Sequence, residues 1–307
     1  MGDTIIKTNN IVKKYGRSFA LNNVNLNVKA GQIYGLIGKN GAGKTTLFKI
    51  FSGLTIQTDG ALELFGKSTE KELRKERRRV GCIIETPNFF PYLSAEKNLE
   101  YYRLQRGITG KKCIGEVLEM VELADTGKKK YRDFSLGMKQ RLGLALAMMG
   151  KPDLLILDEP INGLDPIGIV KIRELLKKFN SERNITIIIS SHILGEMSQL
   201  ATAYGFIDNG ELLEESTAEE VNEKCRQCLV LKVNDPERAV VFLENKLYCR
   251  DYEVLNDGSI RVYNFNDKSD LITQTLVGNG VGVYSVSSRG TTLEEYFINL
   301  IGGKQND

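Results

Sequence analysis

The stretch that decides the fold is Gly38-Lys39-Asn40-Gly41-Ala42-Gly43-Lys44-Thr45. It fits the pattern G-x-x-x-x-G-K-[ST], in which glycines let backbone N–H groups turn inward around phosphate oxygens. Lys44 can then reach the outer phosphates, and the Thr45 hydroxyl can ligate Mg²⁺. The apolar residues 33–37 predict a buried strand before this loop, and residues 46–51 predict a helix whose N-terminus favours an anion. In this context a plain glycine-rich turn is the weaker interpretation, and we expect a nucleotide-binding α/β domain.

The length and the charge limit the classes of protein that this chain can represent. A chain of 307 residues predicts one large domain and a smaller one. The formal charge of +3, from 42 basic and 39 acidic residues, is too balanced for a nucleic-acid binder, so no nucleic-acid partner is expected. No apolar stretch approaches the length of about 18 residues that a membrane crossing needs, and the N-terminus lacks a signal-peptide core. We therefore expect a cytoplasmic protein that can dock on a membrane protein.

The cysteines predict neither a disulfide framework nor a metal site. There are five, an odd number spread over the whole length. Cys225 and Cys228 have C-x-x-C spacing, but no second pair and no nearby histidine completes a zinc site.

Two adjacent acids close the most apolar strand of the sequence. Residues 154–157 form a continuous apolar run, which is typical of a central parallel strand covered on both faces, and Asp158 and Glu159 follow. Neighbouring side chains on a strand point to opposite sides, so one carboxylate can hold the Mg²⁺ shell while the other faces an attacking water. The alternative interpretation, an acidic loop after a strand, becomes negligible once the phosphate loop is considered as well.

Four further residues are candidates whose position matters more than their type. Glu85 follows the apolar residues 80–84, and His192, the only histidine, follows residues 185–191, so both lie where ligands bind in open α/β sheets. The Tyr15 ring can stack on a purine, although a surface tyrosine is the commoner interpretation. Ser135 is placed to cap a helix whose first N–H groups suit an anion, but capping alone would also explain it.

Residues 95–130 are predicted to be mostly helical, and from about residue 218 the pattern changes to short alternating elements. We expect strands at 229–233 and 281–286, a hairpin of 252–255 with 260–263, and helices at 236–246, 268–279 and 292–301. This order predicts a small α+β domain.

The order of the phosphate loop, Glu85, residues 134–141, Asp158-Glu159 and His192 resembles the ATP-binding-cassette (ABC) ATPases over residues 4–217. The signature segment, residues 134–141, separates this family from other phosphate-loop proteins. The resemblance implies an α/β P-loop NTPase (ABC ATPase) domain at 1–217, with a mixed-sheet core and a helical subdomain at about 88–150. The small C-terminal α+β domain then covers 218–307.

The resemblance also implies ATP and Mg²⁺ as cofactors, and it assigns roles to individual residues. Lys44, Glu159 and His192 are implied to be catalytic, and the implied metal residues are Thr45, Asp158 and Glu85. The implied nucleotide-binding residues are Tyr15, Gly38, Lys39, Asn40, Gly41, Ala42, Gly43, Lys44, Thr45, Thr46, Glu85, Ser135, Gly137 and Asp165. Ser135 and Gly137 are implied to act on the ATP of a second chain, in a homodimer that sandwiches two ATP molecules.

Three positions depart from the family pattern. Leu136 stands where the family usually has glycine, Met138 where it has glutamine, and Glu85 where it has glutamine. These departures and the ending at residues 292–297 resemble the bacitracin and lantibiotic resistance branch. That branch implies an ATPase subunit on the inner face of the cell membrane that exports a peptide antibiotic through a separate transmembrane permease. A soluble ABC-type ATPase acting on a cytosolic scaffold stays open, whereas a nucleotide kinase would leave His192 and the signature segment unexplained.

Overall fold

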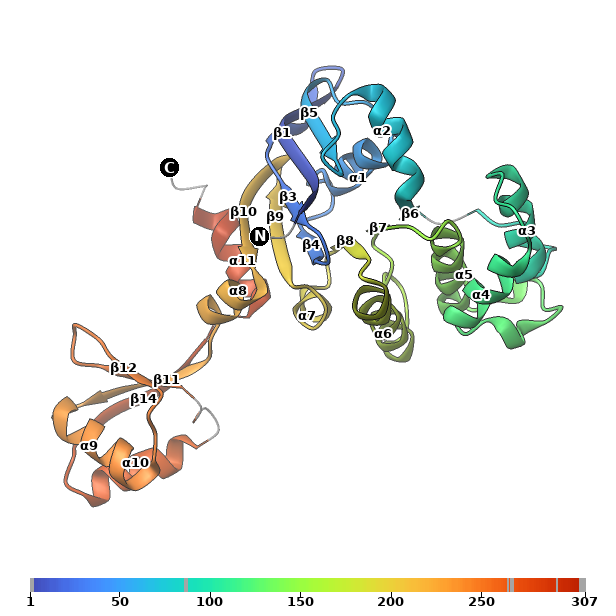
Figure 1. Cartoon of the computed structure of the whole chain (residues 1–307). Coiled ribbons are helices and arrows are strands. Elements are labelled where there is room, and N and C mark those ends of the chain that lie inside the picture. Colours follow the sequence, from blue (N-terminus) through green and yellow to red (C-terminus); the bar gives the residue numbers. More distant parts are fainter. Residues whose placement is uncertain (1–2, 86–87, 264, 266–267, 291, 304–307) are drawn as a thin grey trace. The chain divides into compact units, whose positions relative to one another are not determined.

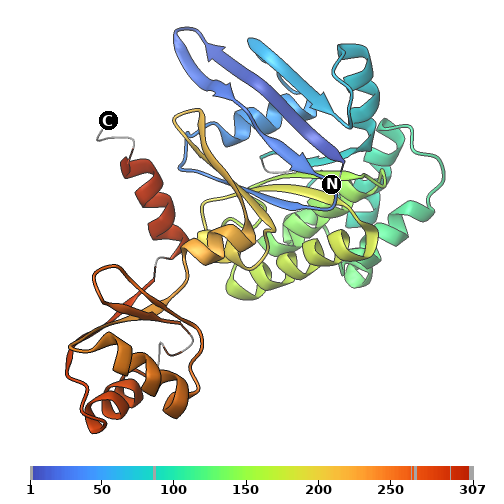
Figure 2. The same ribbon diagram turned by 60° about the vertical axis from the view of Figure 1, so that its left-hand side comes forward.

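The computed structural model describes residues 3–85, 88–263, 265, 268–290 and 292–303, and the chain forms two compact units. The first is Met1–Ala218 and the second is Glu219–Asp307, so the division lies next to the boundary expected at residue 217. Each unit has its own sheet and its own hydrophobic core (Figures 1 and 2).

The first unit is built on a six-stranded mixed sheet with the order β10-β9-β4-β8-β7-β6. Neighbouring strands from β9 to β6 are parallel, and β10 is antiparallel to β9. Every residue of β4 and of β8 is buried, as the continuous apolar runs predict for strands covered on both faces. The strands are β4 (Ile33–Ile37), β6 (Val80–Ile83), β7 (Leu154–Asp158), β8 (Thr186–Ser191), β9 (Ala203–Asp208) and β10 (Glu211–Thr217).

A second, antiparallel sheet contains β1 (Thr4–Tyr15), β2 (Ser18–Val24), β3 (Asn27–Lys29) and β5 (Asp59–Leu64). The sequence predicts one strand over residues 22–28, and this prediction is wrong, because the chain breaks between β2 and β3. At the break the Thr8 hydroxyl donates to the Val24 carbonyl and accepts from the Leu26 N–H. The Thr8 side chain thus bridges the break, beside a backbone hydrogen bond from the Thr8 N–H to the Leu26 carbonyl.

Three helices of the first unit begin at a residue whose side chain caps them. The Ser135 hydroxyl accepts from the Met138 N–H at the start of α5, and Asp165 caps α6 just before Pro166. Helices α3, α4 and α5 pack on one another as a group within the range expected for the helical subdomain (Figure 1). The helices are α1 (Lys44–Ser52), α2 (Glu70–Glu76), α3 (Ala95–Gln105), α4 (Lys112–Met120), α5 (Leu136–Met148), α6 (Pro166–Arg183) and α7 (Leu194–Ser198), with 3₁₀ turns at Arg77–Arg79, Ala124–Thr126 and Tyr131–Asp133.

The second unit is a small α+β sandwich. Its elements from β11 to β14 alternate as βαββαβ, and its antiparallel sheet has the order β12-β13-β11-β14. The two features together define the ferredoxin-like arrangement. This fold carries many unrelated functions, so it does not by itself identify a role. The elements are α8 (Ala218–Lys224), β11 (Cys228–Val233), α9 (Pro236–Leu247), β12 (Tyr252–Val254), β13 (Ile260–Val262), α10 (Ser269–Gly278), β14 (Val283–Arg289) and α11 (Leu293–Gly303). In the parts of both units that the structure describes, no helix is long and apolar enough to cross a membrane.

Candidate nucleotide-binding site

The phosphate loop connects β4 to α1, and two of its glycines are required by the geometry. Gly43 has a φ of 107°, and a Cβ atom there would lie 2.7 Å from the Ala20 carbonyl oxygen. A Cβ atom at Gly38 would lie 2.5 Å from the Ile207 carbonyl oxygen. Any side chain at these positions would therefore displace the loop from the strands beneath it.

Lys44 is buried at the centre of this loop. Its Nζ donates to the carbonyl oxygens of Gly38 at 2.6 Å and Lys39 at 3.2 Å, and lies 3.5 Å from Glu159 Oε1. That carboxylate oxygen is itself buried and accepts no hydrogen bond from the described residues. The loop, Asp158 and Glu159 line a hollow of about 180 Å³. The Lys44 ammonium fits an anionic ligand in this hollow, and the free Glu159 oxygen fits a hydrogen-bond donor such as a water molecule.

Asp158 is held by hydroxyl groups from two other elements. Its Oδ2 accepts from Thr45 Oγ1 at 2.7 Å, and its Oδ1 accepts from Ser190 Oγ at 2.6 Å. Carboxylate and hydroxyl oxygens are ligands that Mg²⁺ prefers, and Mg²⁺ usually completes its shell with phosphate oxygens and water. Among the described residues, no group of three or more acidic, histidine or cysteine side chains is arranged to hold a metal ion. The Thr45 hydroxyl and the Asp158 carboxylate fit a Mg²⁺ ion that takes its other ligands from a nucleotide and water.

Glu159 faces different partners from Asp158. Its Oε2 lies 2.7 Å from Nδ1 of His192, while its Oε1 faces Lys44. Its backbone has a φ of 49°, in the left-handed region that non-glycine residues seldom adopt. This turn places the side chain at the edge of the sheet, between a lysine and a histidine.

Glu85 and Tyr15 lie outside the residues that line this hollow. Glu85 Oε1 is 2.7 Å from Lys49 Nζ, and this hydrogen bond is the main cause that raises the pKa of Lys49. Tyr15 is 54% exposed, with the Lys13 ammonium 5.0 Å from its ring centre.

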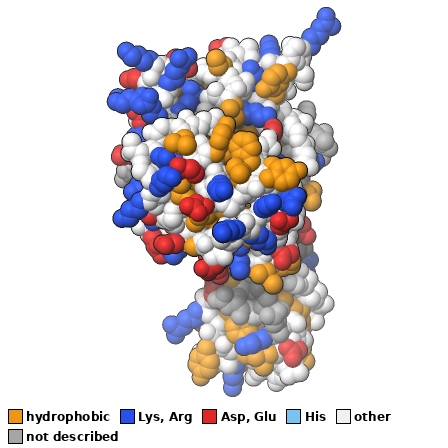
Figure 3. All heavy atoms as spheres, turned by 90° about the vertical axis from the view of Figure 1, so that its right-hand side faces the viewer, with side chains coloured by type: hydrophobic (Ala, Val, Ile, Leu, Met, Phe, Trp, Pro, Cys, Tyr) orange, Lys and Arg blue, Asp and Glu red, His pale blue; other side chains and the backbone are white. Residues whose placement is uncertain are grey.

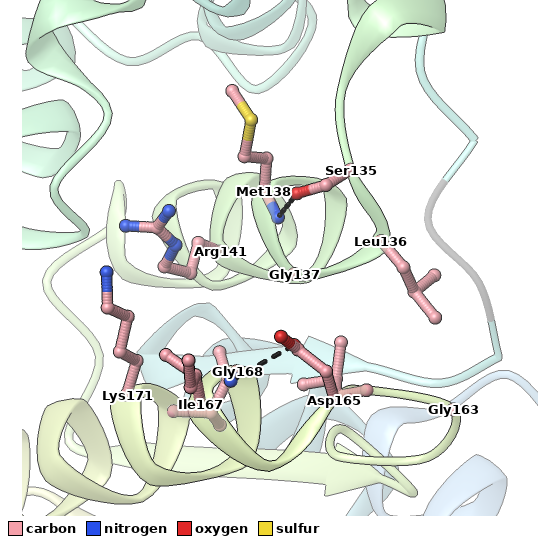
Figure 4. Close-up of a pocket in the computed structure, with 12 residues that line it drawn as sticks. Ser135, Leu136, Gly137, Met138, Arg141, Gly163, Asp165, Ile167, Gly168 and Lys171 are labelled. Carbon is pink, nitrogen blue, oxygen red and sulfur yellow. Dashed lines mark hydrogen bonds between the residues drawn. The ribbon is translucent and has the colours of Figure 1, made fainter.

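The remaining predicted residues line a second hollow of about 410 Å³, to which Ser135, Gly137 and Asp165 all contribute. Figure 4 shows the first turns of α5 and α6 facing each other across it, with Arg141 and Lys171 to one side. Two helix N-termini and two cations favour an anion in this space. None of the residues lining this hollow lines the one around Lys44.

Leu136, the residue in place of the family's glycine, contributes to the wall of this second hollow and is 43% exposed. A Cβ atom at Gly163 would lie only 3.2 Å from its Cδ2, and Gly163 has a φ of 74°. The signature segment and the loop before α6 therefore fit closely together.

Ser190 is a site residue that the sequence reasoning missed. Residues 185–191 were expected only to form a buried strand, yet Ser190 contacts both acids: its hydroxyl donates to Asp158 and accepts from the Glu159 N–H at 2.9 Å. The parallel register places Ser190 beside Asp158. The available signal was a serine near the end of an otherwise apolar strand, but its use depends on which strands are neighbours.

Comparisons with known proteins agree with this architecture. The profile of the ABC transporter family matches residues 21–162. The bacitracin transport ATP-binding protein BcrA of Bacillus licheniformis is 45% identical over 300 residues, which cover 98% of each chain. The lantibiotic transport ATP-binding protein SrtF of Streptococcus pyogenes is 44% identical over 211 residues, covering 69% of this chain and 90% of SrtF.

Among solved structures, a dimeric, post-hydrolysis form of the ATP-binding cassette MJ0796 bound to ADP and Pi matches with a TM-score of 0.63. It is 30% identical, and the match covers 70% of this chain and 99% of that cassette. With its phosphate loop, acidic strand end and signature segment in the same fold, this chain belongs to the ABC transporter family as an ATP-binding, ATP-hydrolysing subunit.

Proposed function

We propose that this chain drives the export of a peptide antibiotic of the bacitracin or lantibiotic type through a separate membrane permease. The similarity to BcrA extends over 98% of both chains and includes the second unit, and SrtF is also named for antibiotic transport. On this proposal the protein acts at the inner face of the cell membrane.

The observation that carries the proposed mechanism is the separation of the two hollows. Lys44, Thr45 and Asp158 line one hollow, while Ser135 and Gly137 line the other. A two-fold dimer can bring the second hollow of each chain against the first hollow of its partner. Each ATP would then lie between the phosphate loop of one chain and the signature segment of the other. The cassette MJ0796, which is 30% identical, is itself dimeric in solved structures. The helix N-terminus at Ser135 would stabilise charge that develops on the phosphate.

Within each such site the residues have distinct tasks. Lys44 would exchange the carbonyl oxygens of Gly38 and Lys39 for β- and γ-phosphate oxygens, and Thr45 and Asp158 would hold Mg²⁺. Bound Mg²⁺ neutralises charge on the phosphate oxygens.

Glu159 accepts the proton of the attacking water, as the bond between the γ-phosphorus and the β–γ bridging oxygen breaks to release ADP and phosphate. His192 would orient Glu159 through Nδ1, and its other ring nitrogen would contact the γ-phosphate. Tyr15 stacks on adenine. Asp165 lines the second hollow, which would face the ATP bound to the partner chain. Glu85 reaches the metal shell only if its ion pair with Lys49 opens.

An exposed apolar patch offers a docking surface for the permease. The patch consists of Phe90, Tyr101 and Leu104, which are 42%, 46% and 63% exposed, and the rings of Phe90 and Tyr101 lie 4.7 Å apart. Tyr101 and Leu104 are three residues apart on α3 and thus share one face. Figure 3 shows apolar side chains gathered on the face of the molecule that carries α3. Exposed patches of this kind mark protein–protein contacts.

Complementation between two inactive variants tests the dimer. Glu159→Gln disables the phosphate side of a site, and Gly137→Asp adds a negative charge on the signature side. The nearest atom to a Cβ at Gly137 is 3.8 Å away, so the second variant should fold. A mixed dimer of the two contains one fully intact composite site. Mixing should therefore restore ATP hydrolysis, and two inactive preparations that stay inactive in stable mixed dimers would contradict the proposal.

Export is tested in a bacitracin-sensitive strain that expresses this chain with its candidate permease. Resistance that depends on Lys44, together with recovery of the permease from detergent extracts, would support the proposal. A cytosolic scaffold recovered in place of a membrane protein would favour the alternative.

A further inference from the structure

We infer that Ser190 is a positioning residue that sets the orientation of both acids at the end of β7. This inference rests on the proposed roles of Asp158 in the metal shell and Glu159 as the base. Ser190 touches neither the nucleotide nor the metal in that scheme, so it acts through the two carboxylates.

The Ser190 hydroxyl makes two directed hydrogen bonds at once. It donates its only proton to Asp158 Oδ1 at 2.6 Å, and its oxygen accepts from the Glu159 N–H at 2.9 Å. The side chain is fully buried, so water does not compete for these bonds. A buried hydroxyl with one donor and one acceptor partner has a fixed rotamer, and it fixes its partners in turn.

For Asp158, the consequence concerns what happens when metal binds. The other oxygen of this carboxylate accepts from Thr45, whose hydroxyl would turn to the metal in the loaded site. Ser190 would then be the protein donor that remains on Asp158 Oδ1. Donors behind a ligating carboxylate typically change metal affinity about 10–100-fold when they are removed.

For Glu159, the consequence concerns the backbone. Its φ of 49° turns the chain out of the strand directly after Asp158. The N–H of this strained residue donates a hydrogen bond to the Ser190 hydroxyl. The hydrogen bond therefore holds the turn that presents Glu159 to Lys44 and His192.

The adjacent Ser191 provides a matched control. It is as buried as Ser190, but its hydroxyl accepts from the Ile193 N–H at 3.0 Å and bonds to neither acid. Changing either serine to alanine removes one hydroxyl oxygen from the same strand. Only the change at Ser190 removes the hydrogen bonds to Asp158 and Glu159.

The test measures how binding of a fluorescent ATP analogue to the full-length chain depends on Mg²⁺ concentration. Ser190→Ala should raise the Mg²⁺ concentration at half-maximal binding about tenfold or more and should lower kcat, whereas Ser191→Ala should leave the Mg²⁺ midpoint near wild type. Equal midpoints for the two alanine variants would overturn the inference. If Ser190→Ala does not fold, Ser190→Thr and Ser190→Val, which have the same shape and differ in the hydroxyl, carry the same comparison.

Asp158→Asn separates this inference from the proposed function. If Asp158→Asn shifts the Mg²⁺ midpoint and Ser190→Ala does not, the inference about Ser190 fails and the metal site stands. If Asp158→Asn leaves the midpoint unchanged, the proposed metal site itself fails.

Discussion

Replacement of Glu159 by glutamine tests the proposed division of labour between the two acids. The change keeps the shape of the side chain and its contact with His192 but removes its negative charge. A general base contributes about 10²–10⁴-fold to a reaction rate, so hydrolysis should fall by that factor. ATP binding, by contrast, should not weaken.

The reason lies in the contact between Glu159 and Lys44. The two charged groups are 3.5 Å apart and both side chains are largely buried, with 21% and 6% exposure. Unit charges at this distance attract by a few kcal/mol at an effective dielectric constant of about 20. ATP must draw Lys44 away from this partner. If removal of the carboxylate charge recovers about 1 kcal/mol of that attraction, ATP binds about fivefold more tightly.

Calorimetric titration with ATP, a phosphate-release assay and light scattering measure the three expected effects: equal or tighter binding, lost turnover and accumulation of an ATP-bound dimer. Wild-type protein with a non-hydrolysable ATP analogue is the control for dimer formation. Rapid hydrolysis by Glu159→Gln would remove this residue from the role of base. Tenfold weaker ATP binding would refute the argument from its contact with Lys44.

Three further predictions concern other parts of the chain. Lys44→Ala should weaken ATP binding itself, and unchanged affinity in a calorimetric titration would contradict the assignment of the phosphate loop. Tyr101→Glu with Leu104→Glu should prevent co-purification of the permease but leave the ATPase activity of the purified chain unchanged; capture at the wild-type level would contradict the docking surface. Burial raises the pKa of Glu215 above its usual value of 4.5 and outweighs the hydrogen bonds from the Asn27 N–H and the Tyr34 hydroxyl. At pH values between the unfolded pKa of about 4.5 and the raised pKa of the folded state, the folded chain binds more protons than the unfolded chain. The free energy of unfolding should therefore fall as pH rises through this range. Urea unfolding at several pH values should show a shallower fall for Glu215→Gln, and an unchanged slope would exclude this carboxyl as its source.

Much of the fold could be predicted because its signals are local. The apolar run at residues 33–37 and the positive-φ glycines after it specify the strand and the phosphate loop almost alone. The cap at Ser135 marks a helix start in the same way. The break between β2 and β3 could not be predicted, because it depends on Thr8, a residue of another strand.

The site could be predicted in its parts but not in its connections. The sequence places Asp158 and Glu159 at the end of one strand and His192 at the end of another. The register of β7 and β8 decides that Ser190 links the two acids. The pairing of Glu85 with Lys49 likewise depends on how α1 lies relative to the segment after β6, which no periodicity in the sequence encodes.

The close fit between Leu136 and Gly163 has a consequence for anyone who exchanges segments between cassettes. The leucine occupies space that a side chain at residue 163 would need, and the glycine has a backbone conformation that other residues seldom adopt. A signature segment grafted from a relative with glycine at the leucine position would leave this contact empty. A chimaera should therefore take residues 134–141 and the loop before α6 from the same parent protein.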